Sequence, residues 1–146
     1  MTSPMDALIS LEKRHADNIL SGAKQVELRR RTMNISPGAT VWLYAKMPVG
    51  EVLGYVIAES SFVGAPSTVW RKYGPVSGLT KSEFMNYFEG SITASALGIS
   101  SPQRLRSAVS LDSLRLASPG FQPPQFFCRL DRDSTLSKLL RPQVKS

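Results

Sequence analysis

Three ionisable residues, Lys24, Glu27 and Arg29, lie close together near the start of this 146-residue chain. They occupy a stretch with strand character that follows Gly22. Because side chains alternate along a strand, Glu27 and Arg29 are predicted to share one face and Lys24 to point to the other. A turn at Gly22, which glycine permits, would bring Lys24 to the same side. Two cations and a carboxylate held together there could receive an anionic or polar ligand such as a nucleotide; the alternative is a solvated edge strand with self-paired charges.

Each of these side chains has a role that its chemistry allows. Lys24 could bind phosphate as a point charge or, if desolvated, act as a general base. Glu27 could accept a hydrogen bond from the amino group of a base, act as a general base, or only hold its two cationic neighbours in place. Arg29 could contact an anion through its forked guanidinium group. Tyr44, on a later strand, could stack on a base or form a hydrogen bond with it, or it could be a core residue whose hydroxyl reaches the rim.

The elements that must position these residues are short strands alternating with short helices. Strands are predicted over residues 7–11, 25–30, 40–45, 54–61 and 126–130, with a weaker one over 91–97, and helices over 13–21, 66–73, 80–88 and 134–140. Residues 99–125 are rich in Ser, Pro and Arg and show no clear period, apart from a brief helical turn over 111–116. This order predicts an α+β domain built on a compact barrel.

Composition narrows the class of protein. A chain of this length can bury a core in one domain without disulfides or metals. The single cysteine, Cys128, cannot form an internal disulfide, which favours the cytoplasm, and a half-buried structural role is expected for it. One histidine, His15, leaves no metal-ligand spacing, and there is no glycine-rich phosphate loop, so neither a metal nor a cofactor is expected. Neither a signal peptide nor a membrane-spanning helix is indicated, so no membrane partner is expected.

The formal charge of +7 is unevenly distributed. Residues 1–100 contain 10 Lys and Arg against 8 Asp and Glu, whereas residues 101–146 contain 8 against 3. We therefore predict a main domain over residues 1–130 and a basic C-terminal tail over 131–146. Such a tail favours polyanions because neutralising phosphates releases counterions. It could instead contact a protein partner or simply keep the protein soluble.

The order of motifs resembles the ASCH domain family, whose fold is similar to the PUA domain of RNA-modifying enzymes. The matching segments are Ile9-Ser10-Leu11, the pattern Gly22-x-Lys24-x-x-Glu27-x-Arg29, Pro37-Gly38 and Leu43-Tyr44-Ala45. Three later segments resemble the subgroup described as predicted transcriptional regulators with a PUA-like domain: residues 70–74, 87–90 and 120–126. The resemblance spans roughly residues 7–130.

The resemblance implies a small PUA-like β-barrel with short flanking helices and a cleft beside the motif that binds RNA or a nucleotide. Lys24, Glu27 and Arg29 are the motif positions carried over to that cleft. Family members are linked to RNA binding, to ribonuclease activity and to amide hydrolysis of acetylated cytidine. The amidohydrolase members carry threonine where this chain has Glu27, so a hydroxyl nucleophile would be missing, which argues against that activity.

Besides a regulatory interaction module whose basic tail, residues 104–145, contacts nucleic acid or a partner protein, two functions remain open at this point, and whether the protein is an enzyme is undecided. The first is a domain that binds RNA or a modified nucleotide in the motif cleft, with a regulatory role. The second is a hydrolase acting on RNA or on an acetylated nucleoside, in which Lys24 and Glu27 form the acid–base pair.

Overall fold

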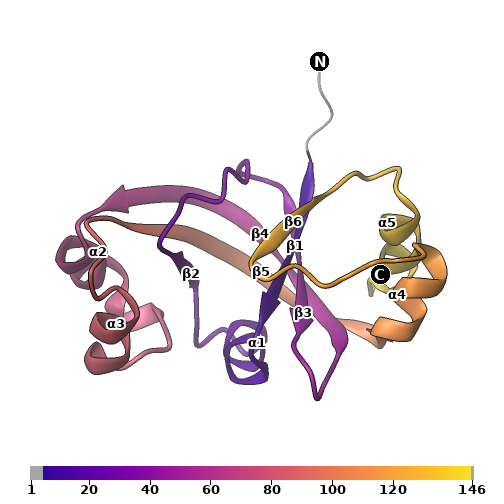
Figure 1. Cartoon of the computed structure of the whole chain (residues 1–146), viewed down its shortest axis with the longest axis horizontal. Coiled ribbons are helices and arrows are strands. Elements are labelled where there is room, and N and C mark those ends of the chain that lie inside the picture. Colours follow the sequence, from indigo (N-terminus) through magenta and orange to yellow (C-terminus); the bar gives the residue numbers. More distant parts are fainter. Residues whose placement is uncertain (1–4, 146) are drawn as a thin grey trace.

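One six-stranded sheet with short helices around it forms the computed structural model, which describes residues 5–145 (Figure 1). The strands are β1 (Asp6–Leu11), β2 (Val26–Arg29), β3 (Thr40–Ala45), β4 (Glu51–Gly64), β5 (Ala94–Ser110) and β6 (Phe127–Leu130). The α-helices are α1 (Lys13–Leu20), α2 (Pro66–Tyr73), α3 (Lys81–Tyr87), α4 (Leu111–Ala117) and α5 (Thr135–Leu140). No helix in this described range is long and apolar enough to cross a bilayer.

The strand order is β2-β5-β4-β3-β1-β6, in which β1 and β3 are parallel and the other neighbours are antiparallel. Figure 1 shows β4 and β5 as a long curved pair that runs from α2 towards α4. Their register shifts at several points, and such bulges increase the local twist of a sheet. The sheet therefore curls into a half-barrel, and the predicted α+β class is confirmed.

The sequence left the order of residues 99–125 undecided, and the structure shows regular elements in its first part, because β5 continues to Ser110 and α4 follows at once. Ser101 and Pro102 lie between the paired positions Ile57–Ser100 and Tyr55–Gln103, where β4 has only one residue to oppose them. Ser101 has a φ of 53°. This bulge interrupts the alternation of apolar residues, and the strand is maintained by its pairing with β4 rather than by its own period.

Both faces of the sheet are covered, and alternation along β1 shows how. Leu8 packs with Trp42 in a cluster that includes residues of α4 and α5, whereas Ile9 packs in a second cluster with Ile19 of α1. A third cluster joins β2 to α2 and α3. The sheet thus lies between α1 on one face and the C-terminal helices on the other, and its β2 end carries α2 and α3.

The C-terminal segment packs on the same core. Leu136 and Leu140 of α5 are buried in the cluster that contains α4. The carboxylate of Asp6 is fully buried and pairs with Arg132 and Arg141, the latter at 2.6 Å between Nη2 and Oδ2. The predicted boundary at residue 130 remains a prediction, and residue 146 of the predicted tail lies outside the described residues.

Candidate functional site

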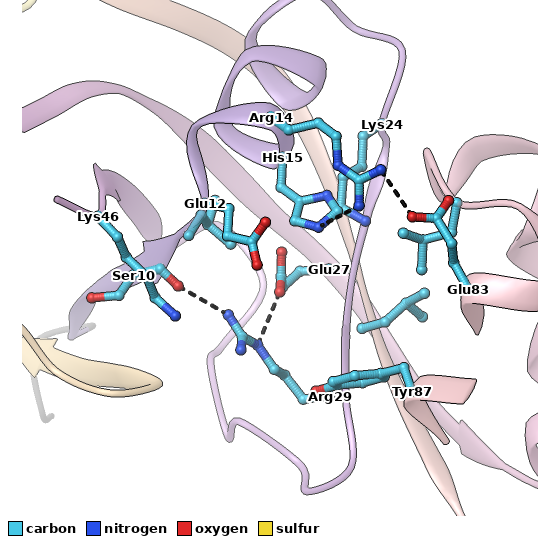
Figure 2. Close-up of a pocket in the computed structure, with 13 residues that line it drawn as sticks. Ser10, Glu12, Arg14, His15, Lys24, Glu27, Arg29, Lys46, Glu83 and Tyr87 are labelled. Carbon is cyan, nitrogen blue, oxygen red and sulfur yellow. Dashed lines mark hydrogen bonds and ion pairs between the residues drawn. The ribbon is translucent and has the colours of Figure 1, made fainter. Parts of the chain in front are cut away.

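A cavity of about 310 Å³ lies where β2, at one end of the curled sheet, approaches β1 near the other end (Figure 2). Its lining comes from the end of β1, the start of α1, the motif around β2, the residue after β3, and α3. The guanidinium of Arg29 in β2 donates to the carbonyl of Ser10 in β1 at 3.3 Å, across the gap between these ends. The ionisable side chains that line the cavity are Glu12, Arg14, His15, Lys24, Glu27, Arg29, Lys46, Glu83 and Tyr87.

The structure brings Lys24, Glu27 and Arg29 together in this cavity. Alternation along β2 buries Val26 and Leu28 in the cluster shared with α3, and Glu27 and Arg29 therefore occupy the other face. Lys24 precedes the strand, so alternation does not govern it. The chain turns at Gly22, which has a φ of 87°, and the Lys24 N–H then donates to the carbonyl of Asn18 at 2.9 Å. This turn is the one that the sequence allowed.

Glu27 has one occupied and one free carboxylate oxygen. Its Oε1 lies 2.9 Å from Nε of Arg29, an ion pair whose N–H is not well aligned with the oxygen. Both side chains are nearly inaccessible, at 5% exposed for Glu27 and 14% for Arg29. Oε2 is buried and has no hydrogen-bond partner among the described residues. Figure 2 shows this second oxygen pointing away from Arg29 into the cavity.

Lys24 is also buried, at 4% exposed, and its Nζ donates to the backbone carbonyl of Ser77. Burial lowers the pKa of Lys24, helped by the cations Arg29 and Arg14 and opposed by Glu27. Burial raises the pKa of Glu27, opposed by Arg29 and Lys24. The two shifts bring the proton affinities of an acid and a base closer together, which is typical of groups that handle protons or bind polar ligands.

The helix α3 contributes to the opposite side of the cavity. Glu83 and Thr80 form both hydrogen bonds of a capping box at the start of α3, in which each side chain accepts from the backbone N–H of the other residue. The Glu83 carboxylate also pairs with Arg14 of α1 at 2.8 Å. His15 lies beside this pair with its Nδ1 buried and unpartnered among the described residues, and burial lowers its pKa, so the imidazole is neutral near pH 7.

Sequence reasoning missed several cavity residues, notably Arg14, Lys46 and Tyr87. Lys46 belongs to the site because β1 and β3 are parallel: Leu11 pairs with Ala45, and the Lys46 N–H donates to the Leu11 carbonyl at 2.8 Å. The residues that follow the two strands therefore meet at one edge of the sheet. The parallel pairing is the signal that would have found Lys46, and no local pattern reveals it.

Tyr44 does not lie in this cavity. It is 2% exposed and belongs to the core cluster of Trp42, because alternation along β3 sends it to the face covered by α4 and α5. Burial raises the pKa of Tyr44, opposed by nearby Arg115, and its hydroxyl has no partner among the described residues. The ligand-binding role predicted for Tyr44 therefore receives no support from the geometry of the cavity.

Cys128 is half-buried against the same cluster, and burial raises the pKa of its thiol. A raised pKa disfavours the thiolate, so this cysteine has the surroundings of a packing residue rather than a nucleophile. Within residues 5–145, no group of His, Cys, Asp and Glu is arranged to hold a metal ion.

We expect the stability difference between wild type and Glu27→Gln to depend on pH. Because the folded pKa of Glu27 lies above its ordinary value of 4.5, its contribution to stability is fully present below that pH and is lost as pH rises through the folded pKa. The unfolding free energy of wild type should therefore fall relative to Glu27→Gln as the pH rises above the ordinary value of 4.5. Urea unfolding at each pH measures this difference, and a constant difference would contradict the raised pKa.

No known family profile matches the chain. It is 36% identical over 130 residues to the ASCH domain-containing ribonuclease of Zymomonas mobilis, covering 89% of this chain and 87% of that protein. The crystal structure of ASCH from Zymomonas mobilis matches it with a TM-score of 0.89 at 33% identity, over 97% of this chain and 96% of that one.

A more distant structure shares the fold alone. The human THYN1 protein, in complex with DNA that contains 5-methylcytosine, matches with a TM-score of 0.57 at 11% identity, over 97% of this chain and 99% of that one. Membership of the predicted transcriptional-regulator subgroup stays a prediction. With its half-barrel fold and its likeness to the Zymomonas protein along nearly the whole length of both chains, this chain belongs to the ASCH domain family and has a PUA-like fold.

Proposed function

We propose that this protein binds single-stranded RNA and holds one base, plain or modified, in the cavity lined by Lys24, Glu27 and Arg29. The observation that carries the proposal is the free Oε2 of Glu27, a buried acceptor that faces the cavity without a partner among the described residues. A buried polar atom left unpaired costs about 1–3 kcal/mol. The amino group of a nucleobase is a donor that satisfies it, as in base recognition through the Watson–Crick edge.

The size and charge of the cavity agree with such a ligand. A volume of about 310 Å³ lies at the small end of ligand pockets and suits a single base rather than a duplex. Arg14, Lys24, Arg29 and Lys46 line it against three carboxylates, so positive charge is in slight excess where a phosphate would follow the base. The Zymomonas relative carries ribonuclease in its name, which favours RNA over DNA as the nucleic acid that is bound.

We expect Lys24→Met to weaken the binding of single-stranded RNA by about 1–3 kcal/mol, which is roughly 5- to 150-fold, because a charge-assisted contact is lost while the side chain keeps its length. Fluorescence anisotropy with labelled RNA over a range of salt concentrations measures the effect. Lys13→Met is the matched control, since Lys13 is exposed on α1, pairs with Asp17 and does not line the cavity. Equal affinity of wild type and Lys24→Met would contradict the proposal.

A second candidate function is RNA hydrolysis, favoured by the opposed pKa shifts of Lys24 and Glu27 and by the name of the relative. One of the two groups would accept the proton of the attacking 2′-hydroxyl, and the other would donate a proton to the leaving 5′-oxygen. This step leaves a 2′,3′-cyclic phosphate, which water then opens to complete the hydrolysis. Such a pair contributes about 10²–10⁴-fold to a rate. Product analysis with the same variants separates the candidates: cleavage lost in both Lys24→Met and Glu27→Gln supports hydrolysis, and cleavage at full rate in both indicates a contaminating nuclease.

Hydrolysis of an acetylated nucleoside has less support, because Glu27 stands where the amidohydrolase members carry threonine. A regulatory role, with a protein partner bound by residues 131–146, also remains a proposal. Two cations of that segment, Arg132 and Arg141, are already paired with Asp6. Deleting the segment would test this role only together with a stability measurement, since Leu136 and Leu140 belong to the core.

A further inference from the structure

A second hollow, of about 500 Å³, is lined by Arg30, Arg31, Thr32, Tyr87, Phe126 and Phe127. We refer to it as the basic–aromatic groove. Two residues link it to the cavity already described. Tyr87 lines both hollows, and Arg29, which lines the cavity, places its guanidinium 4.5 Å from the ring centroid of Phe126. An RNA strand that leaves the cavity can therefore continue into the groove past Arg29 and Tyr87.

None of the described residues that line this groove is acidic. Arg30 is held in place, since its Nε donates to the Tyr87 carbonyl at 2.9 Å and its guanidinium lies 4.8 Å from the centroid of the Tyr87 ring. Arg31 is exposed and makes no hydrogen bond or ion pair with another residue of the described range, and Thr32 beside it offers an exposed hydroxyl. An arginine without a partner next to a hydroxyl is suited to a phosphodiester group.

The aromatic part of the groove is suited to a base. Phe126 and Phe127 are both partly exposed, and their ring centroids are 5.2 Å apart. Aromatic rings that border a basic groove are the usual platform for single-stranded nucleic acids, because every base has a face that can stack and each stacked base contributes about 1–3 kcal/mol. Charge complementarity and continuity with the cavity together favour a nucleic acid strand over an apolar peptide as the occupant.

We propose that the basic–aromatic groove binds the nucleotide adjacent to the one held in the cavity, with Arg31 on the phosphate and Phe126 or Phe127 under the base. This inference rests on the proposed function and deepens it: the ligand is a strand of at least two nucleotides, not a free nucleotide or nucleoside. Lys24 and Glu27 then bind the first nucleotide, and the groove supplies most of the added affinity for an RNA strand.

The test compares 5′-mononucleotides with a random-sequence RNA tetranucleotide as competitors of a labelled single-stranded RNA. We expect the tetranucleotide to compete at least about tenfold better. Arg31→Gln should weaken tetranucleotide binding about five- to tenfold and reduce the salt slope by about 1, with mononucleotide binding unchanged. Arg71→Gln, at an exposed arginine of α2 that lines neither hollow, is the matched control.

Phe127→Leu provides a second variant that retains an apolar side chain in β6, and it should weaken the tetranucleotide alone. The inference is overturned if mononucleotides compete as well as the tetranucleotide, or if Arg31→Gln and Phe127→Leu behave like Arg71→Gln. In either case a loss of binding in Lys24→Met would leave the proposed function standing. Conversely, RNA affinity that falls in Arg31→Gln but is unchanged in Lys24→Met would show that the cavity is not part of the binding site. That result would overturn both the proposed function and the two-nucleotide arrangement.

Discussion

Glu27→Leu is expected to lower the free energy of unfolding by about 3 kcal/mol, because removing one member of a buried ion pair leaves its partner charge uncompensated. Two cations lose their carboxylate here. Arg29 is bound to Glu27 at 2.9 Å, and Lys24, whose pKa is held up by Glu27 against the effect of burial, is almost inaccessible to water. Urea unfolding followed by circular dichroism measures the change.

Glu27→Gln is the matched control for this variant. The amide keeps an oxygen that can accept from Arg29, so we expect a loss of only about 1 kcal/mol. Adding Lys24→Met to Glu27→Leu should recover part of the stability, since one of the two unpaired cations is then gone. If the Leu and Gln variants were equally stable, the carboxylate would not be compensating these cations, and the electrostatic description of the site would be wrong.

Phe84→Ala is expected to cost about 3–4 kcal/mol of stability and also to weaken RNA binding, because it opens a cavity under α3. Phe84 is fully buried, and its ring centroid lies 5.1 Å from that of Trp70 and 4.7 Å from that of Phe88. The helix that it anchors carries Glu83, on the far side of the proposed base cavity, and Tyr87, which lines both hollows. Thermal or urea unfolding together with the RNA titration measures both effects.

Met85→Ala serves as the control for Phe84→Ala, since Met85 is the next residue of the same helix and only partly buried. We expect a loss of about 1 kcal/mol or less at that position and no change in RNA affinity. Equal losses in the two variants would show that the packing of Phe84 does not position α3. A loss of stability at Phe84 without a loss of binding would show that α3 does not contribute to the ligand site.

The two site residues most directly involved in the proposed function are held at an energetic cost. Burial works against the charge of both Lys24 and Glu27, and the pKa of each moves towards the neutral form. An unpaired carboxylate oxygen adds to that cost. Such an arrangement is expected where natural selection favours ligand binding at the expense of folding stability, because the ligand supplies the missing contacts when it binds.

The sequence by itself determined the short-range structure. Strand 40–45 and helix 66–73 were predicted with the bounds that the structure shows, because their apolar periods, the flanking glycine and the proline at the first helical position are local signals. The placement of Glu27 and Arg29 on one face of β2 follows from alternation alone. The motif around these residues, together with the segments that flank it, also identified the ASCH resemblance and, through it, the PUA-like fold.

Only the tertiary structure decided the features that depend on residues far apart in the chain. Pairing with β4 extends β5 through Ser101 and Pro102, although no local period predicts a strand there. The parallel pairing of β1 with β3 brings Lys46 to the cavity, and the curl of the sheet brings Arg29 to Ser10. The burial of Lys24 and the position of Tyr44 outside the cavity have the same origin. Both depend on which elements pack together, and that packing is set by contacts between residues that no short stretch of sequence contains.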